Sequence, residues 1–493
     1  MKYRCIQSNI DWFKKFNELI DNNDNNDSYK SIFDHLIDGI SFDAFISDIF
    51  EQTPCLFHRR ENDANQSPIV EIISKKSFIQ LIKTEFNDEI DPMNNISAVR
   101  YINDERDDLD WFNIKSSKKR KSQNDETIVT SKHIEMAFSD KYTIQFYQPQ
   151  RFVDPLHKIN SSFEYKFGSL AGSSAYLTPN NTQGLPPHND DVDVFVLQTE
   201  GEKEWYIWNG LQELPDTYTR ISRVDLPSEF KKIVLRKGDM LYLPRGTIHE
   251  AIAKDSFSSH VTISVYQHYN MKTLLSRALP LVLNKAFEQN LNIRKGLPIK
   301  LCDTFGTFAG RFGKDTIHPH ITSSRQGMLK ECKDIISNLA DYVTMDTIDQ
   351  AVDEIAMDFI DNRLPPPIIT KKGKTSKGKL SANSMIRLVD PSIMQCLIQE
   401  VEGVSLLIVF NALQNNRLSH MGHPVDDDDE ESEDETLSFP SRLAPVIVTL
   451  TTAFPNLIKI SDMSKQLKLC QIHPDEVLET IQTLSQYNFI ENY

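Results

Sequence analysis

Cysteine pairs, signal-like segments and long apolar runs are all missing from this chain of 493 residues, and each absence excludes a class of protein. The first residues, Met1–Asp11, contain no apolar stretch of the kind that signal peptides use. No apolar run approaches the roughly 20 residues that a membrane-spanning helix needs. A disulfide-stapled secreted domain is also unexpected, because the six cysteines lie far apart. We therefore expect an intracellular protein in a reducing compartment. The cysteines are Cys5, Cys55, Cys302, Cys332, Cys396 and Cys470.

A surplus of positive charge is missing as well. The chain has 70 acidic and 54 basic residues, a formal net charge of -16, and nine of the acids lie in Asp426–Glu435. This balance argues against a protein that coats phosphate backbones, since such binding needs a basic face. It is compatible with a basic protein partner, which an acidic surface attracts. The acidic run itself is either a solvated loop or a segment that attracts or competes with such a partner.

What the chain does have is enough apolar sequence for folded domains, at 39% hydrophobic residues. Residues 1–30 are the exception: they are polar, with Asp21–Asp27 as an Asn/Asp run, and we expect disorder there. A helix is predicted over Ser41–Gln52 from its apolar spacing, with Ser41 as its N-cap. The basic run Lys118–Lys121 is either a solvated loop or a nuclear import signal.

Short strand-like runs separated by turn residues fill residues 142–268. Many short strands of this kind predict an all-β barrel or jelly roll. Turns are expected at Gly201–Glu202, Lys237–Asp239 and Pro244–Gly246. The predicted strands are Tyr142–Tyr147, Ser174–Leu177, Val192–Gln198, Glu204–Trp208, Ile233–Leu235, Met240–Leu243 and Val261–Tyr266.

Helical patterns return after Met271. Further helices are predicted at Ser324–Tyr342 and Thr347–Asn362, and a strand at Val404–Phe410. Near the end of the chain, Ile460–Leu467 and Pro474–Leu484 resemble a helix-turn-helix pair. The second of these helices has no Lys or Arg. We therefore favour a structural or dimerisation role and expect no direct reading of DNA.

The candidate chemistry lies in the segment Gly184–Asp191. Alternate residues of an extended strand point to the same face, so His188 and Asp190 converge. His249, on a distant strand, is the natural third ligand. Two histidines and one carboxylate on one face leave open positions on a metal, a donor set typical of non-haem Fe(II). Catalytic zinc also accepts this set, and a chance His-x-Asp in a surface loop is the simplest alternative.

Three further residues support a site. Lys203 follows the turn after His188 and is flanked by apolar strand residues, so it needs an anion if it faces the barrel interior. An exposed hairpin lysine is the alternative. Tyr176 and Ser264 lie on predicted strands, where their hydroxyls could add hydrogen bonds to the same anion.

The sequence from Ile144 to His268 resembles the catalytic domain of the JmjC-type ribosomal oxygenases, and most of all their Myc-induced nuclear antigen (MINA) type. Shorter segments outside the barrel resemble the entry segment, the helical region and the winged-helix region of that family. The stretches that carry the resemblance are Ile144–Phe152, Phe167–Pro179, Gln183–Trp205, Lys237–Ala251 and His260–Gln267 in the barrel, and Phe45–Arg59, Met357–Pro366, Asn415–His420 and Phe439–Pro440 outside it.

The resemblance implies an α+β protein with a double-stranded β-helix (a jelly roll of the cupin/JmjC kind), a helical dimerisation domain and a C-terminal winged-helix domain. Their expected bounds are 31–270 (core 142–268), 271–370 and 380–493, the last with an acidic insert at 426–435. It implies an Fe(II)- and 2-oxoglutarate-dependent dioxygenase that uses dioxygen to hydroxylate the β-carbon of a histidine in a large-subunit ribosomal protein. A homodimer in the nucleus or nucleolus is implied as well.

Carried over position by position, the resemblance makes His188, Asp190 and His249 the iron ligands. Lys203 would pair with the C5 carboxylate of 2-oxoglutarate, near Tyr176, Ser264 and Ser174. Two positions depart from the family: Ser174 stands where asparagine is usual, and Asn189 where tyrosine is usual. We expect Asn189 to point away from the metal.

Two rival functions share these features. A histone lysine demethylase of the JmjC kind uses the same ligands, so only the product distinguishes it. A non-enzymatic scaffold in ribosome assembly could keep the barrel without its metal, although all three ligand positions and Lys203 are present here.

Overall fold

The computed structural model describes residues 1–8, 11–22, 27–59, 72–111, 128–307, 319–367, 380–423 and 437–493. The runs Lys118–Lys121 and Asp426–Glu435 lie outside these residues, so their interpretations stay predictions. The chain forms two compact units, one of Met1–His268 with Phe359–Tyr493 and the other of Tyr269–Asp358. Within the described ranges, no helix has both the length and the apolar character to cross a membrane.

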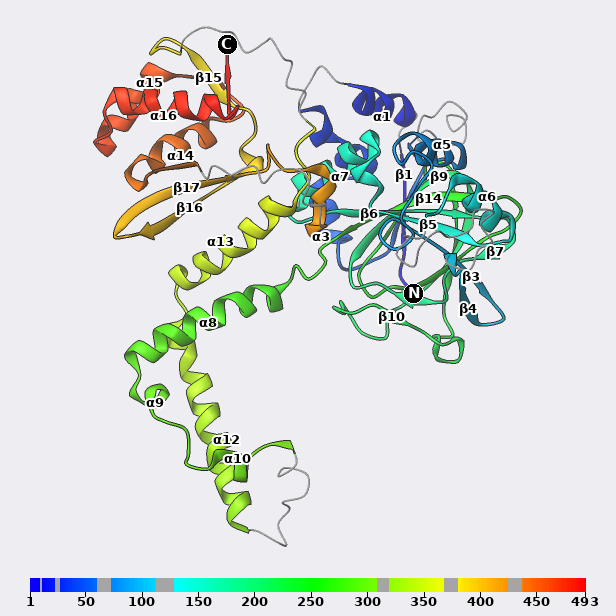
Figure 1. Cartoon of the computed structure of the whole chain (residues 1–493), viewed down its shortest axis with the longest axis horizontal. Coiled ribbons are helices and arrows are strands. Elements are labelled where there is room, and N and C mark those ends of the chain that lie inside the picture. The colour runs from blue at the N-terminus through cyan, green and yellow to red at the C-terminus, as the bar shows by residue number, and fades with distance from the viewer. Residues whose placement is uncertain are drawn as a thin grey trace, which may run out of the picture. The chain divides into compact units, whose positions relative to one another are not determined.

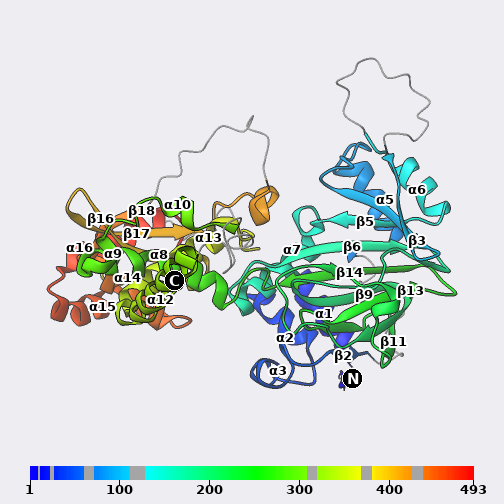
Figure 2. The same cartoon turned by 90° about the horizontal axis from the view of Figure 1, so that it is seen from below.

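The predicted barrel is present as a double-stranded β-helix of two antiparallel sheets. Strand β9 belongs to both: its first half pairs with β12 and β14, and its second half with β11 and β13. Figure 2 shows β5, β6, β14 and β9 side by side in the first sheet. The strands are β5 (Thr143–Tyr147), β6 (Gly172–Thr178), β7 (Thr182–Gln183), β8 (His188–Asn189), β9 (Asp193–Trp208), β10 (Thr219–Arg220), β11 (Lys231–Arg236), β12 (Met240–Leu243), β13 (Ile248–Ala253) and β14 (Ser258–Val265).

Gly201 lies where β9 passes from one sheet to the other. Its φ is +65°, and a Cβ atom there would lie 2.0 Å from the carbonyl oxygen of Phe257. Only glycine fits this corner. The sequence predicted two strands separated by a turn at Gly201–Glu202, whereas the structure has one strand that bends there. After the bend, the second half of β9 carries Lys203 into the barrel.

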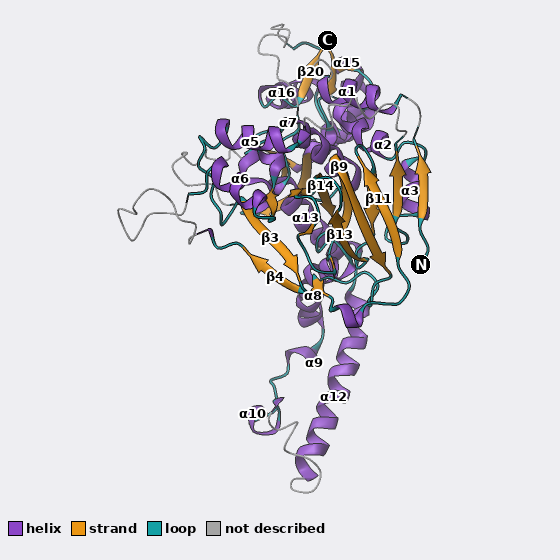
Figure 3. Cartoon of the chain, turned by 90° about the vertical axis from the view of Figure 1, so that its right-hand side faces the viewer, coloured by secondary structure: helices purple, strands orange, loops and turns teal. Residues whose placement is uncertain are grey.

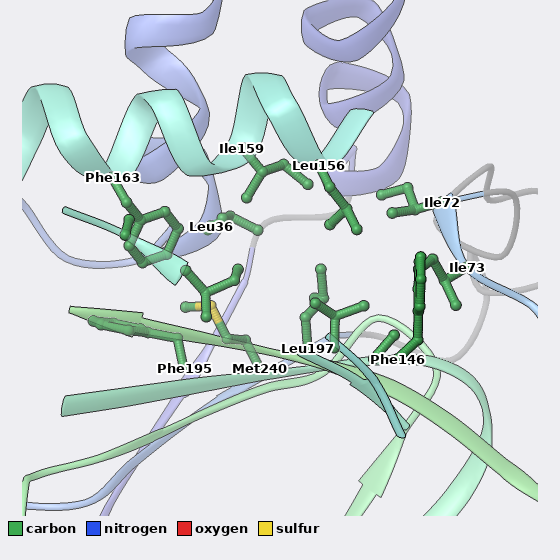
Figure 4. Packing of buried hydrophobic residues seen from close by; sticks show 14 of the residues in the cluster. Leu36, Ile72, Ile73, Phe146, Leu156, Ile159, Phe163, Phe195, Leu197 and Met240 are labelled. Atoms are coloured by element: carbon green, nitrogen blue, oxygen red, sulfur yellow. The ribbon is translucent and has the colours of Figure 1, made fainter. Parts of the chain in front are cut away.

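Helix α7 (Asp154–Phe167) covers the outer face of the first sheet and forms the main core with it. Figure 4 shows Ile159 and Phe163 of this helix above Phe195 and Leu197 of β9. Because side chains alternate along a strand, the residues between them, such as Val194 and Val196, point to the other face. There they line the interior cavity of the barrel. One face of β9 therefore holds the core together while the other face forms the site.

The N-terminal segment is ordered over most of its length, so the prediction of disorder for residues 1–30 is wrong there. Strand β1 (Arg4–Gln7) pairs in parallel with β2 (Cys55–His58). Helix α1 (Trp12–Asp21) buries Trp12, Phe16 and Ile20, which lie four residues apart and so share one helix face. The Asn/Asp run that follows dominated the composition and concealed this amphipathic helix.

The other predictions around the barrel hold with small shifts. Helix α3 (Phe42–Asp48) begins after Ser41, whose hydroxyl accepts a hydrogen bond from the backbone N–H of Ala44 at 3.2 Å, as expected of an N-cap. The helix ends earlier than predicted. Helix α2 (Ile32–Leu36) and α5 (Lys75–Thr84) add to the same core, and β3 (Ile96–Ile102) and β4 (Glu105–Asp108) extend the first sheet beyond β5.

The second unit, Tyr269–Asp358, is helical (Figure 3). Its main helices are α8 (Met271–Gln289), α12 (Pro319–Leu339) and α13 (Met345–Asn362), with short α9 (Leu291–Arg294) and α10 (Leu301–Thr304) between them. Arg277 on α8 pairs with Glu354 at 3.3 Å and Asp358 at 2.5 Å on α13. The three predicted helices are present, and the unit ends at Asp358 rather than at residue 370.

The C-terminal segment has a hydrophobic core of its own, formed by helices and two small three-stranded sheets. The predicted helix pair is present as α15 (Ile460–Leu467) and α16 (Pro474–Gln486), preceded by α14 (Ala444–Ala453). The β-hairpin of β16 (Met394–Val401) and β17 (Val404–Asn411) adds the wing-like element. Figure 1 shows the helices beside this long hairpin. These are the elements that a winged-helix domain requires. The remaining strands are β15 (Met385–Leu388), β18 (Leu437–Pro440), β19 (Ile458–Lys459) and β20 (Ile490–Asn492).

Candidate metal centre and adjoining cavity

Two adjacent strands bring the predicted ligands together. His188 on β8 and His249 on β13 are direct cross-strand partners, and their ring centroids lie 4.3 Å apart. Asp190 follows β8, with its carboxylate oxygens 3.8 Å from Nε2 of His188 and 3.6 Å from Nε2 of His249. One ligand atom from each of the three residues lies within 4.8 Å of the others. The side chains of His188 and Asp190 therefore lie on the same side, as the His-x-Asp spacing predicted, and His249 joins them.

Backbone carbonyls orient both imidazoles. Nδ1 of His188 lies 2.8 Å from the carbonyl oxygen of Pro186, and Nδ1 of His249 lies 3.0 Å from that of Thr247. A carbonyl oxygen can only accept, so each Nδ1 carries the proton and each Nε2 presents its lone pair. Burial and the neighbouring His188 lower the pKa of His249 to about 4. This imidazole is therefore neutral at neutral pH, the form that binds a metal.

The donor set fits a divalent transition metal. Two imidazole nitrogens and one carboxylate on one side of a cavity leave positions open for other ligands, as in the facial triads of non-haem Fe(II) enzymes. Zinc remains chemically compatible with the same atoms. In the described part of the chain, this is the one cluster of three or more His, Cys, Asp or Glu side chains with metal-binding proximity.

A cavity of about 330 Å³ adjoins the triad inside the barrel. All seven residues that the sequence analysis assigned to the site line it. They come from β6, β8 with the residue after it, β9, β13 and β14. They are Ser174, Tyr176, His188, Asp190, Lys203, His249 and Ser264.

Lys203 is buried in this cavity without an anionic partner among the described residues. Its ammonium donates a hydrogen bond to Oγ1 of Thr178 at 3.0 Å, and the Trp205 ring lies 6.0 Å away. Burial alone lowers the pKa of Lys203 to about 7. A buried ammonium whose one hydrogen-bond partner is neutral is stabilised when an anion binds beside it. The alternative of an exposed hairpin lysine is therefore wrong.

Two neighbouring strands supply a polar wall. Alternate residues Ser174, Tyr176 and Thr178 of β6 face the same way, opposite alternate residues of β14. The hydroxyl of Tyr176 accepts a hydrogen bond from Nε2 of Gln145 at 2.9 Å, and burial raises the pKa of Tyr176 above its usual value. Tyr176 is therefore a neutral hydrogen-bonding group here. The wall residues of β14 are His260, Thr262 and Ser264.

Sequence reasoning missed three of these wall residues, Thr178, His260 and Thr262. Thr178 and Thr262 lie two residues, and His260 four residues, from one that was identified on the same strand, so the strand period was the available signal. It also missed two residues nearer the mouth, for which no sequence signal exists. Tyr218 lies with its ring 5.3 Å from that of His188, and Arg106 is paired with Asp108 at 2.6 Å.

Asn189 and Ser174, the two residues that depart from the expected family pattern, both fit the structure without disturbing the triad. Asn189 is buried, and its side-chain amide donates to the carbonyl oxygen of Thr217 at 3.2 Å. It is not among the residues that line the cavity, in accord with the expectation that it points away from the metal. Ser174 does line the cavity, with a shorter side chain than the asparagine usual there.

Residues 145–274 match the family model described as the JmjC domain. This part of the chain is a JmjC domain. The match begins in β5 and ends at the start of α8, so it contains the triad, Lys203 and the polar wall. The predicted fold, a double-stranded β-helix of the JmjC kind, is confirmed.

Curated relatives are similar over longer stretches. A bifunctional lysine-specific demethylase and histidyl-hydroxylase NO66 from Drosophila persimilis is 35% identical over 234 residues, which is 47% of this chain and 33% of that protein. The chain thus spans about a third of this relative's length. Ribosomal oxygenase 2 from Rattus norvegicus is 28% identical over 409 residues, which is 80% of each protein. The resemblance to the JmjC ribosomal oxygenases is confirmed, with relatives of both names.

Among solved structures, the ribosomal oxygenase YcfD of Escherichia coli aligns with 92% of this chain and 98% of its own, at 12% identity and a TM-score of 0.41. A TM-score at this level is too low to carry an argument about the fold. The fold assignment rests instead on the strand pairing and on the domain match.

Proposed function

We propose that this protein is an Fe(II)- and 2-oxoglutarate-dependent oxygenase that hydroxylates the β-carbon of a histidine in a large-subunit ribosomal protein, in ribosome biogenesis. One observation carries the proposal. A triad suited to Fe(II) and a buried lysine without an anion line the same cavity. A 2-oxo dicarboxylic acid matches both, because one end chelates a metal and the other is an anion.

The residues present fit both groups. His188, Asp190 and His249 would hold the iron, and Lys203 would hold the distal carboxylate beside Thr178. When bound, iron would activate dioxygen, and 2-oxoglutarate would supply two of the four electrons that dioxygen takes up, being oxidised to succinate and carbon dioxide. The protein orients the co-substrate between two fixed ends. The valine side chains of β9 that face the cavity, Val194 and Val196, give it an apolar side.

The substrate assignment is supported by the relatives and by charge. Proteins named ribosomal oxygenase and histidyl-hydroxylase match much of this chain. The net charge of -16 favours the approach of basic proteins, a class to which ribosomal proteins belong. At the mouth, Tyr218 is positioned to contact an entering side chain close to the metal.

A second candidate is demethylation of a lysine on a histone tail. The Drosophila relative is named a lysine-specific demethylase as well as a histidyl-hydroxylase, and this name supports demethylation as the second candidate. Histone tails are also basic, so charge does not separate the two substrates. The chemistry does: hydroxylation adds an oxygen atom to histidine, whereas demethylation removes a methyl group from lysine.

The test supplies the full chain with Fe(II) and 2-oxoglutarate without oxygen, then admits air over a mixture of peptides. The mixture contains histidine segments of large-subunit ribosomal proteins and methylated histone tails, and the products are read by mass spectrometry. The proposal expects a histidine that gains one oxygen with the wild type and not with His188→Ala. Methyl loss alone would support the second candidate. No turnover together with no bound iron would support a scaffold.

We also propose that the protein is a homodimer formed through the helical unit, and that it acts in the nucleus or nucleolus. Large apolar side chains recur every fourth residue along α8 and are exposed there, a spacing that places them on one helix face. A second copy of the chain would cover this stripe. Its members are Met271, Leu275, Leu279, Leu283 and Phe287.

A further inference from the structure

His260 is a titratable side chain of the cavity to which the proposed chemistry gives no role. It lies on β14, directly opposite Tyr176 on β6, and lines the cavity while being only 2% exposed. Its ring stacks on that of Tyr176 at 4.9 Å, with 5° between the planes. The Trp205 ring meets it edge-on at 5.5 Å. Two aromatic neighbours therefore fix the imidazole in one orientation.

The two ring nitrogens of His260 have different surroundings. Nδ1 is buried and has no hydrogen-bond partner. Nε2 is therefore the nitrogen that remains available to the cavity. A proton on Nδ1 would find no acceptor, so the ring is better satisfied with its proton on Nε2, directed at whatever the cavity binds.

The imidazole is also held neutral. Burial, with a smaller contribution from the nearby Lys203, lowers the pKa of His260 well below its usual value. The ammonium of Lys203 donates to Thr178, which lies two residues along β6 from Tyr176, the cross-strand partner of His260. His260 therefore lies near the end of the cavity that holds the lysine. A neutral N–H donor beside a buried ammonium is suited to share a carboxylate with it, since one oxygen can accept from each.

We infer that His260 binds the distal carboxylate of the co-substrate, with Nε2–H donating beside the ammonium of Lys203, so that the cavity selects a dicarboxylic over a monocarboxylic 2-oxo acid. This inference rests on the proposed use of 2-oxoglutarate and extends it. Tyr176 then has a second task, because its ring supports the imidazole from one face.

Two variants separate hydrogen bonding from packing. His260→Phe keeps an aromatic ring between Tyr176 and Trp205 but has no donor. His260→Gln loses the ring but places an amide N–H near the position of Nε2. If His260 only fills space, phenylalanine is the better replacement; if it donates to the co-substrate, glutamine is.

The experiment measures binding without turnover. Each protein is loaded with Mn(II) in the absence of oxygen and titrated calorimetrically with 2-oxoglutarate and with 2-oxobutanoate, which lacks the distal carboxylate. We expect His260→Phe to bind 2-oxoglutarate about 10- to 100-fold more weakly, the range for a lost hydrogen bond to a charged group. Its affinity for 2-oxobutanoate and for Mn(II) should stay near that of the wild type, and His260→Gln should recover part of the loss.

Three results would overturn the inference: wild-type affinity for 2-oxoglutarate in His260→Phe, an equal loss for both acids, or a larger loss in His260→Gln than in His260→Phe. A wild type that binds Mn(II) but not 2-oxoglutarate would instead refute the proposed function, and the inference with it. Failure of the inference and failure of the function are therefore distinct outcomes.

Discussion

His188 and His249 face each other across one antiparallel strand pair, and each donates Nδ1–H to a carbonyl two residues earlier in its own segment. The same kind of local hydrogen bond therefore orients both imidazole rings so that Nε2 faces Asp190. Because the orientation comes from backbone carbonyls, the site is formed before a metal arrives, and binding requires little rearrangement of these rings.

Metal affinity should therefore depend on the triad and not on its neighbour in the sequence. We expect His188→Ala and Asp190→Ala to bind Mn(II) at least about 10- to 100-fold more weakly, since each change deletes a ligand. Asn189→Ala is the matched control, because Asn189 lies between the ligands but donates to Thr217. Isothermal titration with Mn(II) measures all three. Equal losses in Asn189→Ala and His188→Ala would contradict this assignment.

Lys203 should make the ligand-free protein less stable as the pH falls. Its folded pKa is about 7, whereas an unfolded lysine has a pKa of about 10.4. Between these values the unfolded chain holds a proton that the folded chain lacks, so the free energy of unfolding rises with pH across this window and levels off below it. Lys203→Met should remove this dependence and stabilise the protein at pH 7.

Urea unfolding of the wild type and Lys203→Met at pH 7 and pH 9 measures this effect. Lys132→Met, at an exposed lysine, is the control and should leave the pH dependence unchanged. Parallel curves for the wild type and Lys203→Met would contradict the account.

Binding of 2-oxoglutarate should be coupled to proton uptake at the same lysine. A carboxylate beside Lys203 stabilises the ammonium and raises its pKa. At pH 8, above the pKa of the free site, binding should take up close to one proton per chain, and at pH 6 close to none. Calorimetry in buffers of different ionisation enthalpy gives this number. Equal proton uptake at both pH values would exclude Lys203 as the carboxylate partner.

Glu164 on α7 should be important for stability rather than for chemistry. Its buried carboxylate accepts hydrogen bonds from Nε2 of His420 at 2.8 Å and from the backbone N–H of Leu364 at 3.1 Å. Removing one partner of a buried charged group destabilises a protein by about 3–5 kcal/mol, and we expect that loss in Glu164→Ala.

The control for this loss is Asp154→Ala on the same helix. The Asp154 carboxylate pairs with Arg417 at 2.7 Å but is 85% exposed, so its removal should change the free energy of unfolding by less than about 1 kcal/mol. Chemical denaturation compares the two variants. Similar losses would show that burial does not decide the contribution of Glu164.

The apolar stripe on α8 should mediate self-association. A glutamate in place of Leu279 or Leu283 would put a charge into a covered apolar surface, and we expect Leu279→Glu and Leu283→Glu to be monomeric. Asn284→Glu adds the same charge at an exposed polar position of the same helix and should stay dimeric. Analytical ultracentrifugation of the full chain decides this. A monomeric wild type would refute the proposed dimer.

The sequence predicts site residues correctly where their positions depend on neighbouring residues of one strand. The i, i+2 relation of His188 and Asp190 depends on strand geometry alone. His249 is not local to them, and it was proposed as the third ligand from its residue type and from the family resemblance. His260 and Thr178 were missed although strand alternation places them on the same face as Ser264 and Tyr176. Which residues of that face reach the cavity depends on how β6, β9 and β14 align, and spacing within one strand does not determine this. Helix α1 was missed because a polar run beside it dominated the composition of residues 1–30.

The central claim is that this chain inserts an oxygen atom from dioxygen into a histidine. The most direct measurement follows the reaction with the ribosomal peptide mixture under ¹⁸O₂ in ordinary water, with 2-oxoglutarate present or omitted. We expect a histidine that carries the heavy oxygen only when 2-oxoglutarate is supplied, and succinate formed alongside it. A histidine that stays unmodified while bound Fe(II) and 2-oxoglutarate are both detected would contradict the account.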